Sequence, residues 1–143
     1  MSQASPFYKF VIAVNKTLEP GVALNAVAHT SLGICAKATL EQREQMHFIS
    51  FVDGSGQTHE PISALSLIVL RATNGELKKL LQAAQECSVL SVDFLQTMTG
   101  ATYVEQLEKT KSTIQDDLVY YAVGLFGPKD IIDSFTKKLS LWK

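Results

Sequence analysis

Tyr8–Asn15, which reads Y-K-F-V-I-A-V-N, is the segment that decides the fold. Its centre, Phe10 to Val14, is an uninterrupted apolar run rich in β-branched residues. Such runs are typical of a strand that is covered on both faces. Leu65 to Leu70 and Leu118 to Phe126 have the same character. Three strands of this kind indicate helices on both sides of one sheet.

Helical patterns fall between these strands. Pro20 to Leu32 follows the first strand, begins with a proline that suits a first helical turn, and ends before Gly33. Glu76 to Glu86 carries leucines at helical spacing, and Thr73 with Glu76 has the T-x-x-E pattern of a capping box. We expect a last helix to begin at Pro128, followed by a C-terminal Leu141-Trp142 pair that completes the core.

The remaining segments are less regular. His47 to Val52 predicts a strand that enters a turn at Asp53-Gly54-Ser55-Gly56. Val89 to Leu95 predicts another strand, and Thr102 to Lys109 a short helix. Together these patterns predict an α/β fold, with a single mixed sheet of about four strands and helices on both faces. We found no internal repeat or linker, and therefore expect residues 1–143 to form one domain.

Composition narrows the class of protein. The chain has 143 residues, of which 46% are hydrophobic and 19% charged, and a formal net charge of −1. The near-neutral charge argues against general attraction to nucleic-acid backbones or anionic membranes. No apolar run is long enough to span a bilayer, and Met1 to Pro6 lacks the features of a signal peptide. We therefore expect a soluble cytoplasmic protein, with Cys35 and Cys87 as free thiols.

The first predicted helix carries the first candidate site. Asn25 and His29 are one helical turn apart and therefore share a face. On one interpretation they form a polar pair at the edge of a cleft, where Asn25 orients a ligand and His29 acts as a catalytic base or hydrogen-bond donor. On the other they are structural. Asn15 ends the first strand, where ligands of open α/β sheets bind, although asparagine also favours turns.

A second candidate site follows the strand at Val89 to Leu95. Asp93 is a candidate catalytic residue, and Thr97, Thr99 and Thr102 are candidate ligand-binding residues whose hydroxyls offer donors and acceptors. The alternative is a turn whose threonines bond to their own backbone.

No metal or cofactor is expected. His47 and His59 flank the Asp53–Gly56 turn, but no third ligand is evident, and zinc needs three or four. The turn itself lacks the further residues of a calcium loop or a phosphate-binding loop.

Four segments carry a resemblance to known proteins. They are Lys9–Asn15, P-G-V-A-L-N-A-V-A-H at Pro20–His29, Leu65–Glu86, and G-L-F-G-P-K-D-I-I-D-S-F-T-K-K-L-S-L at Gly124–Leu141. With them the chain resembles the domain-of-unknown-function 2000 family and, more distantly, the peptidyl-tRNA hydrolases of the archaeal and eukaryotic type. The resemblance implies the mixed sheet described above, of the peptidyl-tRNA hydrolase II type, and often a homodimer.

The resemblance carries over to the site only in part. His29 matches the histidine of the hydrolases' first helix, and Asp93 and Thr97 match the types and spacing of their late loop. Val22 stands where the hydrolases have a lysine, and Ala26 where they have a glutamine. Leu95 likewise replaces the glycine of the late loop.

The leading functional expectation is a relative of these hydrolases that binds a small molecule or a peptide-like group in a polar cleft. Two alternatives stay open. One is an active ester hydrolase acting on aminoacyl- or peptidyl-tRNA, and the other is an interaction module without chemistry.

Overall fold

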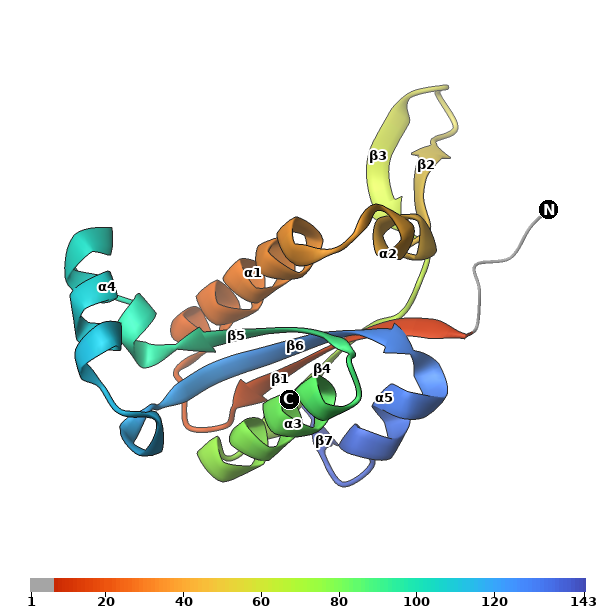
Figure 1. Ribbon diagram of the computed structural model, residues 1–143. Helices are drawn as coiled ribbons and strands as arrows, with labels where there is room; N and C mark the ends of the chain where they lie inside the picture. The colour runs from red at the N-terminus through yellow and green to blue at the C-terminus, as the bar shows by residue number, and fades with distance from the viewer. Residues whose placement is uncertain (1–6) are drawn as a thin grey trace.

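The computed structural model describes residues 7–143, so Met1 to Pro6, where no signal peptide was expected, lies outside the described residues. Five strands form the main sheet (Figure 1). In spatial order they are β5 (Leu90–Leu95), β6 (Tyr120–Pro128), β1 (Tyr8–Asn15), β4 (Leu67–Ala72) and β7 (Ser140–Leu141).

The sheet is mixed, as the sequence predicted. β1 and β4 are parallel, while β6, β5 and β7 each run antiparallel to the neighbour they pair with. The expectation of about four strands was wrong by one. The additional strand is β7, which is only two residues long and has no recognisable pattern. Of the C-terminal pair expected to complete the core, Trp142 packs against the core, whereas Leu141 of β7 is exposed.

Helices cover both faces of the sheet (Figure 1). Side chains along β1 alternate between these two faces. Ile12 and Val14 point toward α1 (Pro20–Lys37) and pack with its small residues, such as Ala26. Val11 and Ala13 point the other way, into the core under α3 (Asn74–Glu86) and α5 (Lys129–Thr136). The capping box of Thr73 and Glu76 begins α3, as expected.

α1 continues past Gly33, so the prediction that it ends at Leu32 was wrong. The reason is that Gly33 serves close packing and not termination. A Cβ at this position would lie 2.8 Å from Cγ1 of Val92 on β5. A side chain there would force the helix away from the sheet.

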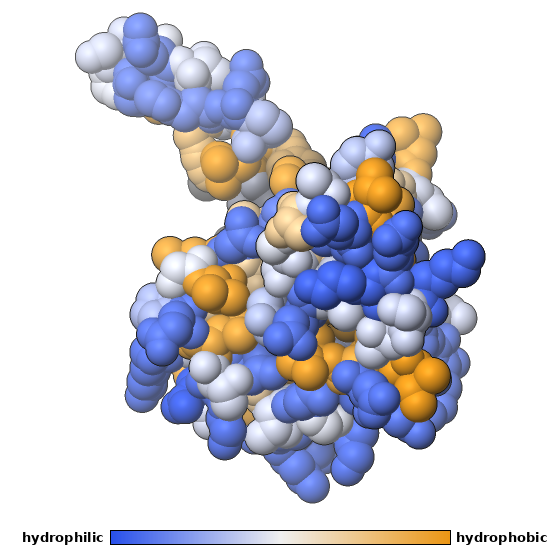
Figure 2. Space-filling model, turned by 90° about the vertical axis from the view of Figure 1, so that its left-hand side faces the viewer, coloured by the Kyte–Doolittle hydropathy of each residue, from blue (hydrophilic) through white to orange (hydrophobic). Residues whose placement is uncertain are grey.

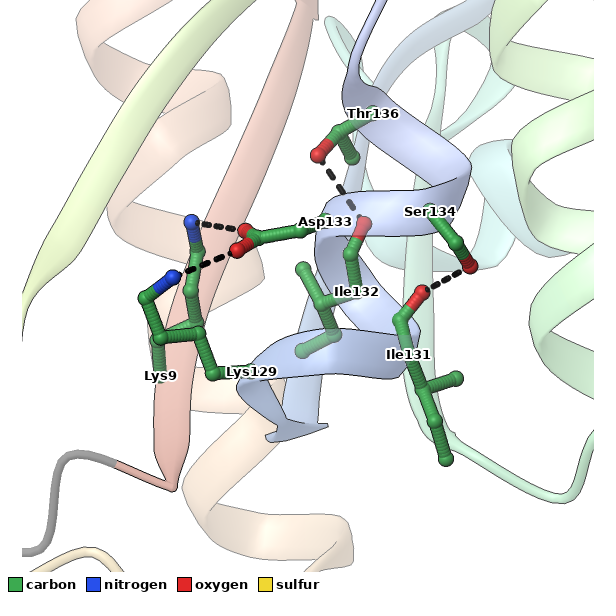
Figure 3. Close-up of polar contacts among 7 residues, drawn as sticks. All are labelled: Lys9, Lys129, Ile131, Ile132, Asp133, Ser134 and Thr136. Atoms are coloured by element: carbon green, nitrogen blue, oxygen red, sulfur yellow. Dashed lines mark hydrogen bonds and ion pairs between the residues drawn. The ribbon is translucent and has the colours of Figure 1, made fainter.

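An ion-pair bridge fastens α5 to the central strand (Figure 3). The carboxylate of Asp133 accepts hydrogen bonds from Lys9 Nζ of β1 at 2.6 Å and from Lys129 Nζ at 2.7 Å. The hydrogen bonds from Lys129 and Lys9 hold the pKa of Asp133 below its ordinary value.

The other elements stand outside the main sheet. α2 (Leu40–Gln45) follows α1 and leads into a separate antiparallel hairpin of β2 (Phe48–Val52) and β3 (Thr58–Ser63). The 3₁₀ turns η1 (Gln96–Met98) and η2 (Gln115–Asp117) flank α4 (Tyr103–Ser112), which has no buried residue. In residues 7–143 no helix is both long and apolar enough to cross a membrane.

Candidate functional site

Asn25 and His29 both lie exposed on α1, which leaves their side chains accessible. The imidazole of His29 stacks on the ring of Phe94 of β5, with centroids 5.0 Å apart and planes 6° from parallel. His29 therefore covers part of the α1 face of β5 and is not sealed in the core.

Asp93 lies on the opposite face of the sheet from His29. It precedes Phe94 on the same strand and is paired with Val123, whose side chain belongs to the core under α3. Desolvation by partial burial raises the pKa of Asp93, and the charge of Lys37 offsets part of this effect. The two residues predicted to be catalytic do not converge.

Asn15 is buried, and three hydrogen bonds hold its side chain in place. Its Nδ2 donates to the carbonyl oxygen of Tyr120 at 2.9 Å, and its Oδ1 accepts from the backbone N–H of Thr17 at 3.0 Å and from the Thr17 hydroxyl at 2.7 Å. The side chain closes the turn after β1 and ties it to β6. Ligand binding by Asn15 would have to break these bonds.

Thr97, Thr99 and Thr102 form hydrogen bonds within their own segment of the chain, in line with the alternative of a turn without a ligand. Thr97 Oγ1 accepts from the hydroxyl of Thr110 at 2.8 Å, and Thr99 donates to the carbonyl of Gln96 at 2.6 Å. Thr102 is the N-cap of α4 and accepts from the N–H of Glu105 at 3.3 Å. The Thr97–Thr110 bond joins η1 to α4, whereas the bonds of Thr99 and Thr102 stay within η1 and α4 respectively.

The strand and turn predicted at His47–Gly56 are confirmed, but the strand belongs to the β2–β3 hairpin, so the expectation of a single sheet was wrong. The hairpin stands away from the body as an arm (Figure 1), and its outer end is hydrophilic while hydrophobic residues gather where it joins the body (Figure 2). Within the turn, Asp53 Oδ2 and His59 Nε2 are 2.8 Å apart, and this hydrogen bond is the main cause of the lowered pKa of Asp53. In the described part of the chain no group of three metal-ligating side chains exists.

A cleft of about 290 Å³ lies between α1, the base of the hairpin and the sheet. Its lining residues share one property, which is that none carries a charge. They are Phe10, Ser31, Ile34, Cys35, Phe48, Pro61, Ile62, Ser63, Leu65 and Leu67.

The two hydroxyl groups of the cleft are already satisfied as donors. Ser31 Oγ donates to the carbonyl of Val27 at 2.9 Å, as serines on helices commonly do. Ser63 Oγ donates to the carbonyl of Met46 at 2.5 Å and accepts from the N–H of Leu65. Free Cys35 adds a thiol, which behaves as a small apolar group with a weak donor. The cleft is therefore an apolar surface with a few lone pairs.

Sequence reasoning missed this cleft. Phe10, Ile34 and Leu65 are indistinguishable from ordinary core residues by pattern, and they are indeed buried in a core cluster. The available signal was the apolar content of the hairpin, because Phe48 and Ile62 are too apolar for a solvated loop. Predicting the cleft would have required recognising β3 as a strand, and Pro61 within it argues against a strand because proline cannot donate a ladder hydrogen bond.

The comparisons with known proteins agree with the fold. A family model described as a protein of unknown function, DUF2000, matches residues 8–143. A solved structure of a protein of unknown function, Atu0240 from Agrobacterium tumefaciens, superposes with a TM-score of 0.79 at 20% sequence identity. The alignment covers 97% of this chain and 100% of that one. No curated protein matched. Neither match is to a peptidyl-tRNA hydrolase, and the family match over nearly the whole sequence shows that the chain belongs to the DUF2000 family.

Proposed function

We propose that this protein binds a neutral small molecule with a mainly apolar body in the cleft between α1 and the β2–β3 hairpin. The observation on which the proposal rests is that the lining includes no charged side chain. An ionised group placed there would lose its hydration without gaining a counter-charge, at a cost of several kcal/mol. An apolar group would lose only unfavourable contact with water.

The size of the cleft favours a small occupant. Its volume of about 290 Å³ lies just below the range of roughly 300–1,000 Å³ that is typical of small-molecule sites. A single aromatic or branched aliphatic group fits this space, whereas a folded partner element does not. One such group with a polar atom near the Ser31 hydroxyl is a small molecule, as expected from the sequence, but the cleft proposed here is apolar and includes none of the predicted site residues.

The hydrolytic alternative has less support. Hydrolysis requires a base and a positioned water. By the resemblance to the hydrolases, His29 and Asp93 would fill these roles. These lie on opposite faces of the sheet, and Asn15 and the late threonines are bonded to their neighbours. We therefore propose ligand binding without a catalytic step.

The test is to fill the cleft from α1. Ser31→Phe places a ring in the cleft without removing a core side chain, and Ala36→Phe places the same ring on an exposed position of the same helix as a matched control. The probe is a series of neutral aromatics, from phenol to naphthol, and the readout is the melting temperature of the full chain. At a probe concentration of 100 times Kd, binding stabilises the folded state by about 2.7 kcal/mol.

The wild type and Ala36→Phe should gain several degrees in Tm with increasing probe, while Ser31→Phe should gain none. Equal gains in Ser31→Phe and Ala36→Phe would refute the site. A negligible gain in the wild type across the whole series would refute the proposed ligand class.

The two thiols provide a second readout. Cys35 lines the cleft and Cys87 is exposed away from it. A saturating neutral probe should slow the alkylation of Cys35 and leave that of Cys87 unchanged, which mass spectrometry of the labelled peptides measures. Equal rates for Cys35 with and without bound probe would contradict the proposal.

A further inference from the structure

A second hollow lies where the parallel strands β1 and β4 end, and it differs in chemistry from the apolar cleft. Its volume is about 170 Å³. The residues that line it come from four separate segments of the chain. They are Lys16, Arg71, Ala72, Glu76, Lys138, Leu139 and Ser140. None of them lines the apolar cleft.

Unpaired positive charge distinguishes this hollow. Lys16 follows β1, Arg71 lies on β4, and Lys138 precedes β7. Within residues 7–143 none of the three forms an ion pair. The single carboxylate in the lining, that of Glu76, accepts the N–H of Thr73 at 2.9 Å in the capping box. Three cationic residues and one engaged carboxylate thus line the hollow, in a chain whose net charge is −1.

The fold adds to this positive potential. Lys16 follows the carboxyl end of β1, and α3 follows the carboxyl end of its parallel neighbour β4. Open α/β sheets bind their ligands at this edge. α3 begins two residues after β4, so the positive end of its dipole lies beside the hollow. Like charges gathered without partners repel one another, and a bound anion would relieve that repulsion.

The adjoining hollow indicates what kind of anion fits. A space of about 440 Å³ between α3 and α5 shares Glu76, Lys138 and Leu139 with the first and includes the apolar side chains of Leu80 and Phe135. A ligand can therefore place a charged group among the cations and an organic body beside Leu139.

We propose that this hollow binds the phosphate group of a small phosphate monoester, with Lys16, Arg71 and Lys138 as its ligands. A dianionic phosphate matches three cations better than a carboxylate does, and the guanidinium of Arg71 suits its oxygens. The site is independent of the apolar cleft, so either proposal can fail without the other.

The experiment compares two double variants of the full chain that remove the same charge. Lys16→Gln with Lys138→Gln changes the hollow, and Lys109→Gln with Lys111→Gln changes two exposed lysines of α4 as the matched control. Isothermal calorimetry with glycerol phosphate, at an ionic strength held constant with chloride, measures Kd. The wild type and the α4 control should bind alike, and the hollow variant should bind at least about tenfold more weakly.

Three further titrants separate the sources of phosphate. Inorganic phosphate should bind at the same site more weakly than the monoester, because it lacks the organic body. Binding to a single-stranded oligonucleotide, or to vesicles containing phosphatidic acid, with no binding of the monoester would overturn the proposal. Equal affinities of the two double variants for the monoester would overturn it as well.

Discussion

Gly124 on β6 offers the sharpest test of how α1 lies on the sheet. A Cβ at this position would lie 2.4 Å from Cγ2 of Thr30 and 2.8 Å from Cδ1 of Ile34, both on α1. The Ile34 methyl is the end of a flexible side chain and can rotate away. The Thr30 methyl is attached directly to a branched Cβ, whose χ1 has only two favoured values in a helix, so this methyl has much less freedom to move away. The change Gly124→Ala must therefore move the helix or the strand.

The size of the effect follows from that contact. Relieving it to an ordinary carbon–carbon separation of about 3.5 Å requires a shift of about 1 Å. Thr30 and Ile34 are fully buried, so the surroundings have little room to give. Overpacking of this kind costs about 1–3 kcal/mol, and we expect the upper end because the clash involves a stiff side chain in a central strand.

Thr30→Ser supplies the control, because it removes the clashing methyl and keeps the hydroxyl. Alone it should cost about 1 kcal/mol for one buried methyl group. Combined with Gly124→Ala it should recover at least about 1 kcal/mol relative to the sum of the two single variants. Urea denaturation of the four proteins measures this coupling. A cost below about 0.5 kcal/mol for Gly124→Ala, or additive single effects, would refute the close seating of α1.

Four further expectations follow from single side chains. Asn15→Ala should lower the free energy of unfolding by about 1–3 kcal/mol, because it leaves the carbonyl of Tyr120 without its donor; denaturation with an unchanged midpoint would contradict this. Asp133→Asn should cost less than about 1 kcal/mol at neutral pH, since the pair is partly exposed. That cost should vanish as the pH falls below 3.8 and through the lowered pKa, which a pH series of melting temperatures checks. Asp93→Asn should stabilise the protein at neutral pH, because the raised pKa shows that folding disfavours the charged form, and destabilisation there would count against it. His29→Ala should leave binding of neutral aromatics in the cleft intact, because His29 does not line it, and calorimetry detects any loss.

The buried framework could be predicted from the sequence because its patterns are local. The apolar run of β1 and the capped leucine stripe of α3 each encode their structure within a few residues, and both were confirmed. Gly33 was misread for the opposite reason. Its role is a contact with Val92, nearly sixty residues away, and no local pattern distinguishes a packing glycine from one that ends a helix.

The site was harder to predict because polar residue types do not reveal their partners. Asn15 and Thr99 have the chemistry of ligand-binding groups, but their side chains donate to backbone carbonyls, those of Tyr120 and Gln96. The face of the sheet on which a side chain lies also decides which residues can meet. Asp93 and Phe94 are adjacent in sequence, and the strand turns them to opposite faces, so only Phe94 meets His29. The cleft itself is built from residues that pattern alone assigns to the core.

The central claim is that an apolar ligand enters between α1 and the hairpin, and methyl NMR of the full chain with a neutral aromatic probe tests it most directly. Ile34 and Ile62 line the cleft from its two sides, whereas Ile132 is a residue of α5 that is buried on the other face of the sheet. Saturating naphthol should produce ring-current shifts and intermolecular NOEs at Ile34 and Ile62 and leave Ile132 unmoved. NOEs to Ile132, or shifts spread evenly over all three methyl groups, would contradict the claim.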